Sequence, residues 1–437
     1  RCSTEVAETH HKGNHAMTDV ATSPHSRDWA TEFDHTKDDY AAAAPEIWDE
    51  LRSSCPVAHS DAHGGVWLPT RHADVSAVAN DTDRFSSEGV IVNVWKPAGI
   101  APVGYAPPIT SDPPFHADAR RILLPAFAPK QVARWEDATR ATCNELIDEI
   151  LESEPGPEDP VDAATRYAQH IPVRVIAEML GLPREDGDRF RTFIHRILEK
   201  PGQQHATDPE DTLVHYLSTV IAARRREPAR DDLIGFLLDA ELEGEPLTDE
   251  HIFGSIALLL IAGIDTTWSA IGSSLWHLAL HPEHRDRLRN DPDVEPFAIE
   301  ELLRFYAPVT MARIVAEGVD DAEVGGCPVK SRDWVLLPFP AANRDPEAFE
   351  RADEFVIDRQ RNRHLAFGLG IHRCLGSNLA RMELRVAVTE WLRRIPDFEL
   401  ADPDPSSVRW STGQVRGPRE LPVKILRTAV PDEEARQ

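Results

Sequence analysis

The chain has 437 residues, of which 47 are Lys or Arg and 74 are Asp or Glu, so its formal net charge at pH 7 is −27. This acidity argues against nucleic acid or an anionic membrane as a partner, because both bind basic surfaces. Hydrophobic residues make up 41% of the chain, which indicates a globular protein, long enough to bury a core around a sizeable cofactor.

The N-terminal residues 1–16 contain no apolar run, so they are not a signal peptide. We expect them to be an artificial leader or a disordered tail, and residues 17–437 to form a single domain. The five cysteines include no C-x-x-C pair, which excludes a zinc ribbon or disulfide framework and favours a reducing cytoplasm. The longest apolar run in a helical pattern, Ile256–Ile264, is far shorter than the roughly 20 residues of a membrane span, so no membrane partner is expected.

Helical patterns dominate residues 115–310, which predicts a mainly α fold with a minor β region in one large domain. The shorter predicted helices are Pro129–Leu151, Ala163–Leu180, Asp186–Glu199 and Asp211–Arg226. The predicted strands are Gly65–Pro69, Arg313–Val315, Trp334–Pro338 and Pro422–Leu426.

Ahead of these helices, Pro113 and Pro114 favour a helix start. His116 and Arg120 then share one face of that helix at i, i+4 spacing. Taken alone, such a basic pair faces solvent more often than a ligand.

The longest predicted helix begins after Thr248, a favourable N-cap, and ends near His281, because Pro282 cannot continue it. Its middle is apolar on nearly every face, so we expect a central, buried helix. Within it, Ala262-Gly263-Ile-Asp265-Thr266-Thr267 is a poor choice for helix stability. One interpretation is that its threonine hydroxyls simply bond to backbone carbonyls of their own helix, without further consequence. The alternative is that the backbone hydrogen bonds of the helix are loosened here to accommodate dioxygen and water.

Glu301 and Arg304 have a spacing of three and can pair on one helix face. Most such pairs are solvated surface bridges that contribute less than about 1 kcal/mol. The Glu301–Arg304 pair taken alone therefore indicates little about function.

The most informative segment is 364–376, which reads HLAFGLGIHRCLG. Its three glycines let a flat ligand approach the backbone closely. A helix predicted over Leu375–Ile395 would place the thiol of Cys374 at its N-terminus, where the dipole and free N–H groups lower a thiol pKa. An anionic sulfur of this kind suits an axial iron ligand.

Two other interpretations of Cys374 stand beside this one. A cysteine at a helix start is often a buried structural thiol. It could also be a catalytic nucleophile with His372 as its base, although no Asn or Asp that would orient the base is evident nearby.

The pattern F-G-x-G-x-H-x-C-x-G around Cys374 closely resembles the haem-binding loop of the cytochrome P-450 family. The motifs at 112–121, 262–267 and 301–304 follow in the family's order. The resemblance implies haem b (iron protoporphyrin IX) held by the Cys374 sulfur, beneath a long central helix that crosses the haem. It also implies a monooxygenase that inserts one oxygen atom from dioxygen into an organic substrate, by hydroxylation or dealkylation.

The resemblance carries the following roles onto this sequence. Asp265 and Thr266 become the acid–alcohol pair that relays protons, with Asp265 connected to solvent. Glu301 and Arg304 match the E-x-x-R motif, with Arg359 as the third member of a structural cluster, although Val356 stands where many relatives carry Asp. The positions that would contact the cofactor, including four donors for its propionates (His116, Arg120, Arg313 and His372), are His116, Arg120, Ala262, Gly263, Thr267, Val309, Arg313, Ala366, Phe367, Gly368, His372, Cys374, Leu375 and Gly376.

Substrate contacts are expected from largely aliphatic positions, which favour a small-to-medium apolar molecule. They are Ile91, Val94, Leu258, Met311, Gln414 and Val415. Ile91 and Val94 could equally be ordinary loop-packing residues.

No reductase motif follows Ile425, so electrons from NAD(P)H are expected through a separate ferredoxin and ferredoxin reductase, as the resemblance implies. A basic patch of Arg120, Arg121, Arg373 and Arg381 could attract such a partner to a monomeric protein. A peroxide-driven peroxygenase and a non-catalytic haem gas sensor are the alternatives. A cysteine hydrolase built on Cys374 and His372 is a further one.

Overall fold

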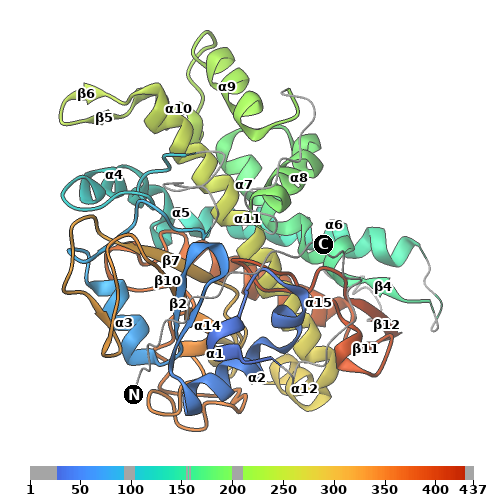
Figure 1. Cartoon of the computed structure of the whole chain (residues 1–437). Coiled ribbons are helices and arrows are strands. Elements are labelled where there is room, and N and C mark those ends of the chain that lie inside the picture. The colour runs from blue at the N-terminus through green and yellow to red at the C-terminus, as the bar shows by residue number, and fades with distance from the viewer. Residues whose placement is uncertain (1–26, 93–103, 154–155, 157–158, 199–209, 429–437) are drawn as a thin grey trace, which may run out of the picture.

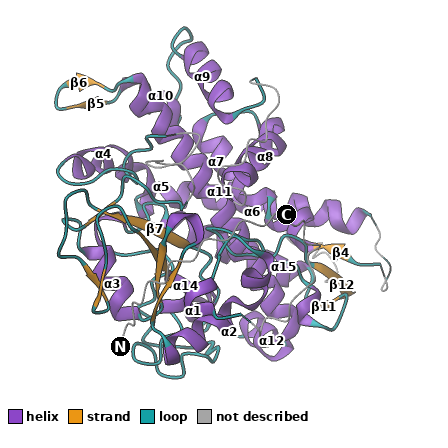
Figure 2. Ribbon diagram, viewed as in Figure 1, coloured by secondary structure: helices purple, strands orange, loops and turns teal. Residues whose placement is uncertain are grey.

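The computed structural model describes residues 27–92, 104–153, 156, 159–198 and 210–428. The predicted leader, residues 1–16, lies outside this part of the chain. Helices form most of the molecule, and the larger sheet lies to one side of it (Figures 1 and 2). This arrangement confirms the prediction of a mainly α fold with a minor β region.

The α-helices are α1 (Trp29–Glu32), α2 (Asp38–Ser54), α3 (His72–Asn80), α4 (Phe115–Leu123), α5 (Pro129–Val132), α6 (Glu136–Glu152), α7 (His170–Leu180), α8 (Gly187–Leu198), α9 (Leu213–Arg224), α10 (Leu233–Asp239), α11 (Asp249–Leu280), α12 (Pro282–Asn290), α13 (Glu295–Phe305), α14 (Phe339–Ala342) and α15 (Ser377–Arg394). The strands are β1 (Val57–Ser60), β2 (Val66–Pro69), β3 (Phe85–Ser86), β4 (Val161–Asp162), β5 (Glu241–Leu242), β6 (Glu245–Pro246), β7 (Thr310–Val315), β8 (Glu323–Val324), β9 (Cys327–Pro328), β10 (Trp334–Pro338), β11 (Asp397–Leu400) and β12 (Pro422–Arg427).

Helix α11 runs through the middle of the molecule, as its apolar composition predicts (Figure 1). Thr248 caps it by accepting a hydrogen bond from the N–H of His251 at 3.2 Å, and the helix ends two residues before Pro282. Among the described residues, α11 is the one helix whose length and composition would suit a membrane span, but 72% of its apolar window is buried inside the protein. Burial of this extent is what a core helix shows.

Two predicted helices are interrupted. The segment Pro129–Leu151 divides into α5, a 3-10 turn and α6, and Ala163–Leu180 begins with a π turn over Ala164–Ala168 before α7. Pro172 lacks the N–H that would bond to the carbonyl four residues earlier, which favours the wider turn there. Helices α8 and α9 lie within one or two residues of their predicted ends.

The larger sheet has the strand order β1-β2-β10-β7-β3. Strand β10 pairs antiparallel with β7, with Leu337 opposite Met311, and parallel with β2. All five residues of β10 are buried, which agrees with its unbroken apolar sequence. The pairing holds β7, which carries Met311 and Arg313, at the cavity described below.

Glu301, Arg304 and Arg359 form the predicted cluster, and it is buried rather than solvated. The Glu301 carboxylate accepts hydrogen bonds from Arg304 (2.8 Å to each oxygen), from Arg359 Nε (2.9 Å) and from Asn362 (3.0 Å). The backbone N–H of Val356, the residue that departs from the family pattern, supplies a further donor to Glu301 at 2.8 Å.

Arg304 in turn donates to three backbone carbonyls, those of Asn343, Ala352 and Glu354, at 2.8–2.9 Å. One buried side chain therefore fastens α13 to the segment 343–354. That segment leads into the loop that carries Cys374.

Candidate functional site

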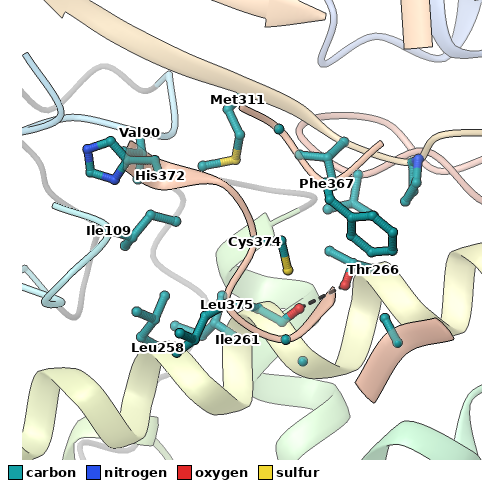
Figure 3. A pocket seen from close by; sticks show the side chains of 18 of the residues that line it. Val90, Ile109, Leu258, Ile261, Thr266, Met311, Phe367, His372, Cys374 and Leu375 are labelled. Atoms are coloured by element: carbon teal, nitrogen blue, oxygen red, sulfur yellow. Dashed lines mark hydrogen bonds between the residues drawn. The ribbon is translucent and has the colours of Figure 1, made fainter. Parts of the chain in front are cut away.

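A cavity with a volume of about 260 Å³ lies between α11 and the 364–376 loop (Figure 3). Strand β7 and the segment around residues 414–415 complete its wall. The predicted cofactor-contacting residues that line it are Arg120, Ala262, Gly263, Thr267, Val309, Arg313, Ala366, Phe367, Gly368, His372, Cys374, Leu375 and Gly376. The structure therefore brings together in one place residues that are up to 256 positions apart.

The thiol of Cys374 is accessible, and the space it faces is this cavity (Figure 3). A hydrogen bond of 2.7 Å from its N–H to the carbonyl of Phe367 closes the loop. Helix α15 begins at Ser377, so Gly376 rather than Cys374 occupies its N-cap. The sulfur still lies beside the first turn of the helix.

The expectation of a lowered pKa for the Cys374 thiol is wrong. The thiol is open to the cavity but enclosed by protein, and this desolvation raises the pKa of Cys374 above its ordinary value. The N–H of Gly376 and the charges of Arg120, Arg373 and Arg381 lower the pKa, but by less. The helix start and the nearby arginines act on the thiol as expected, but desolvation is the larger effect on its pKa.

The loop reaches this shape because two of its glycines have left-handed backbone angles, Gly368 at φ +62° and Gly370 at φ +66°. A Cβ on Gly370 would lie 3.0 Å from the carbonyl oxygen of Ala79. Both positions thus need glycine to turn the backbone and pack the loop against α3.

Across the cavity, Ala262, Gly263, Thr266 and Thr267 line the face of α11. The helix is continuous through this stretch, so the ladder is not broken here. Thr266 Oγ donates to the carbonyl of Ala262 at 2.8 Å, which is the back-bond considered from the sequence (Figure 3). The same hydroxyl oxygen faces the cavity, so the back-bond and an accessible alcohol occur together.

Asp265 does not line the cavity, and the expectation that it connects to solvent is wrong. Its side chain is 3% exposed and forms a bidentate pair with Arg419, at 2.8 Å (Oδ1) and 3.0 Å (Oδ2). The Arg419 guanidinium also stacks over Trp268, 4.4 Å from the ring centre, and lies 3.4 Å from Ser269 Oγ. A carboxylate in the low-dielectric interior needs such a cation.

An Arg419→Gln variant tests this pair, because it takes the cation away from a buried carboxylate. We expect a loss of about 3 kcal/mol in the free energy of unfolding, measured by urea denaturation. The double variant Asp265→Asn, Arg419→Gln should recover much of that loss, since it removes both charges. Equal stability of the wild type and the single variant would contradict the buried pair.

Cationic and hydrogen-bonding groups gather at one end of the cavity. Arg313 is buried, donates to the carbonyl of Ala312 at 2.8 Å, and keeps its charge although burial lowers its pKa to about 10. Burial and the neighbouring arginines Arg313 and Arg120 lower the pKa values of His116 and His372, the latter to about 2, so both rings are neutral. His372 Nε2 lies 2.9 Å from Ser87 Oγ.

His116 does not line the cavity, although its ring centre lies 4.4 Å from that of His372. Its Nε2 is buried and has no hydrogen-bond partner among the described residues. A buried arginine and an orphaned imidazole nitrogen are what a carboxylate-bearing ligand would satisfy. The residues present therefore fit a haem, with a thiol on one face and donors for its propionates at one edge.

Of the predicted substrate contacts, Ile91, Leu258, Met311, Gln414 and Val415 line the cavity. Val94 lies outside the described residues. The cavity has further aliphatic and aromatic lining that the sequence did not single out: Val90, Ile109, Ile176, Leu198, Leu259, Ile261, Leu303, Leu337 and Phe339. Apolar residues of this kind carry no sequence pattern that identifies them as cavity-lining. The role of Arg419 was not predictable from the sequence either, because its partner Asp265 is 154 positions away.

Comparisons with known proteins agree with this geometry. The family model of cytochrome P450 matches residues 188–294 and 296–419. The chain is 36% identical over 363 residues to nocardicin C N-oxygenase from Nocardia uniformis subsp. tsuyamanensis (82% of this chain, 89% of the relative). It is 33% identical over 381 residues to mycinamicin IV hydroxylase/epoxidase from Micromonospora griseorubida (86% and 94%).

Among solved structures, the chain is similar to the cytochrome P450 PksS of the bacillaene polyketide synthase from Bacillus subtilis 168. The TM-score is 0.78 at 29% sequence identity, and the match covers 90% of this chain and all of the other.

Proposed function

The chain belongs to the cytochrome P450 family of haem-dependent monooxygenases, and we propose that it inserts one oxygen atom from dioxygen into an apolar organic molecule of small to medium size. The observation that carries this proposal is a thiol, Cys374, and an alcohol, Thr266, that face one cavity whose other walls are largely aliphatic. We further propose that residues 17–437 form one catalytic unit in the cytoplasm.

When bound, the haem would supply the iron chemistry that activates dioxygen, and the Cys374 sulfur would hold its iron. Arg120, Arg313, His116 and His372 would hold its propionates. The glycines of the 364–376 loop would allow the backbone to approach the haem closely. The small residues Ala262 and Gly263 would leave room for it on the facing side of α11. The apolar wall excludes water and turns the substrate toward the reacting centre.

Oxygen insertion consumes two protons for each dioxygen, and we assign their delivery to Thr266 and Asp265. While Thr266 Oγ donates to Ala262, its oxygen can accept a hydrogen bond from a water in the cavity and so hold that water in place. Arg419 holds Asp265 away from solvent, so its carboxylate must first turn away from the guanidinium and take up a proton from solvent, and only then can it pass that proton inward. Arg419 is therefore a positioning residue in this proposal.

A Thr266→Ala variant should uncouple electron use from product formation, because the alcohol that holds the water is gone while the cavity remains. We expect the product formed per NAD(P)H consumed to fall about 10-fold or more, with hydrogen peroxide accounting for the difference. Thr389→Ala, a back-bonded threonine on α15, is the matched control and should leave coupling unchanged. Full coupling in Thr266→Ala would contradict the assigned relay.

The proposed electron donors are a ferredoxin and its reductase. The basic patch expected to attract them is weaker than its sequence implies, because Arg121 pairs with Asp118 (2.6 Å) and Arg381 pairs with Glu300. Arg120 is assigned to the propionates and donates to the Arg373 carbonyl at 2.6 Å, so Arg373 supplies the patch's remaining positive charge.

The proposal as a whole is tested by titrating the purified holoprotein with a panel of terpenes, fatty acids, aromatics and macrolides and following the haem spin state. A ligand that shifts the spin state is then turned over with NAD(P)H, ferredoxin and reductase, or with peroxide alone. Product in the first reaction supports the monooxygenase. Product with peroxide only would instead make the protein a peroxygenase.

A further inference from the structure

Three metal-binding side chains meet beside the cavity, and the proposed reaction uses none of them. They are Asp34 and His35, between α1 and α2, and His63, in the short 3-10 turn that joins β1 to β2. One carboxylate oxygen and one nitrogen of each ring lie within 4.8 Å of one another. The centres of the two imidazole rings are 5.6 Å apart, with the rings edge to face.

His35 is 2% exposed, and its two ring nitrogens differ in their surroundings. Nε2 lies 2.9 Å from the side-chain amide of Gln414, whereas Nδ1 is buried with no hydrogen-bond partner among the described residues. Burial lowers the pKa of His35 to about 4, so the ring is neutral and one of its nitrogens carries a lone pair. The Gln414 atom placed there is the amide nitrogen, while the amide oxygen is buried without a partner in the described part of the chain. With the amide turned over, its oxygen accepts from Nε2–H and the lone pair of His35 is on Nδ1.

The two carboxylate oxygens of Asp34 also differ, because one accepts hydrogen bonds and the other does not. Oδ1 accepts hydrogen bonds from the N–H and hydroxyl of Thr36 (3.0 and 2.6 Å) and lies 3.1 Å from His63 Nε2. Among the described residues, none donates to Oδ2. The side chains of Asp34 and His63 are 18% and 17% exposed, so water can reach the site.

The backbone at His63 is in the left-handed region, with φ +55°, which is uncommon for a residue other than glycine. In this conformation His63 Nε2 lies 3.1 Å from Asp34 Oδ1. A turn held in an uncommon conformation for the sake of one side chain suggests that the side chain has a task.

We propose that Asp34, His35 and His63 bind a divalent first-row transition metal such as Zn²⁺, with water in the fourth position. Two imidazoles and a carboxylate are ligands that suit Zn²⁺, which binds them at about 2.0–2.2 Å in tetrahedral geometry. Ligand atoms around such an ion lie about 3.3 Å apart, so atoms that now lie within 4.8 Å of one another must draw together by up to about 1.5 Å when the metal binds. The metal takes the place of the proton on His63 Nε2, which leaves to solvent.

The site is joined to the substrate cavity through Gln414, which lines that cavity and contacts His35. The N–H of Gly413 also donates to the His35 carbonyl at 2.9 Å. A metal on His35 would therefore fix the segment that presents Gln414 to the substrate. The metal acts here as a structural clamp on one wall of the cavity.

A second cluster, His281, Glu283 and His284, meets the same distance criterion and serves as the internal control. There His284 Nδ1 lies 3.0 Å from His277 Nε2, and His281 Nδ1 lies 3.2 Å from Glu283 Oε1. No nitrogen of this cluster is both buried and without a hydrogen-bond partner.

The test is Zn²⁺ titration of the haem-loaded full chain by calorimetry, with Co²⁺ absorption as a second signal for tetrahedral coordination. Wild type should bind one equivalent more than His63→Asn or Asp34→Asn, while His284→Gln should match wild type. Asparagine at position 63 tolerates the left-handed backbone, and an unchanged ferrous–carbon monoxide spectrum checks that each variant is folded. Histidines outside the two clusters contribute equally to every protein compared.

Gln414→Leu removes the partner of His35 Nε2 and should weaken Zn²⁺ binding about 10-fold, as loss of an outer-shell hydrogen bond does. Zn²⁺ should also raise the melting temperature of wild type but not of His63→Asn. Equal stoichiometry in wild type, Asp34→Asn and His63→Asn would overturn the site. An unchanged affinity in Gln414→Leu would overturn the role given to His35.

Discussion

A Cys374→Ser variant is expected to form no detectable product with any substrate that the wild type oxidises. The serine hydroxyl keeps the shape of the loop, including the hydrogen bond from residue 374 N–H to the Phe367 carbonyl. It cannot supply the electron-rich thiolate on which activation of dioxygen depends in this family. Product formation per haem, with haem content measured separately, reports the effect.

The matched control is Cys327→Ser, in the β8–β9 hairpin, which should keep wild-type turnover because that cysteine does not line the cavity. If Cys374→Ser retained more than a few per cent of wild-type turnover per haem, the axial role of this residue would be refuted. A loss of turnover shared by both variants would point to damage by serine substitution in general.

A Glu301→Gln variant should lose about 3–5 kcal/mol of stability, because two guanidinium groups would then be buried without their carboxylate. Glu301 and Arg304 side chains are fully buried, and Arg359 is 8% exposed, so water cannot replace the lost charge. The segment that leads to the Cys374 loop is held by Arg304, so haem incorporation should fall together with stability. Urea denaturation and the haem-to-protein ratio measure the two effects.

Glu300→Gln provides the control on the same helix. Glu300 pairs with Arg381 and His364, but its side chain is 30% exposed, so we expect a loss of about 1 kcal/mol or less. A Glu301→Gln protein as stable as Glu300→Gln would show that burial of the cluster contributes little.

Much of the fold followed from local patterns. The start and end of α11 were predictable because a cap, Thr248, and a helix breaker, Pro282, act on their immediate neighbours. The interruptions near residues 133 and 164 were not predictable in the same way, since periodicity alone does not show where a helix changes from α to 3-10 or π geometry.

The site divides along the same line. The 364–376 loop and the Thr266 region were recognisable because their unusual residues are close together in sequence. The ion pair between Asp265 and Arg419 joins α11 to the segment before β12, and no local pattern connects the two positions. The same is true of the contact between His35 and Gln414, which are 379 positions apart.

For the pKa of the Cys374 thiol, the local rule about helix starts and nearby cations was correct but incomplete. The start of α15 and three nearby arginines do lower the pKa of Cys374, but burial raises it by a larger amount. Burial is a property of the whole fold and cannot be obtained from the segment around one residue.

The proposed function depends on a bond between the Cys374 sulfur and iron, and carbon monoxide bound to the reduced holoprotein reports on that bond directly. We expect the strongly red-shifted Soret band of thiolate-ligated haem in the wild type. A Soret band at the unshifted position of histidine-ligated haem, in protein that is folded and fully loaded, would contradict the proposed function.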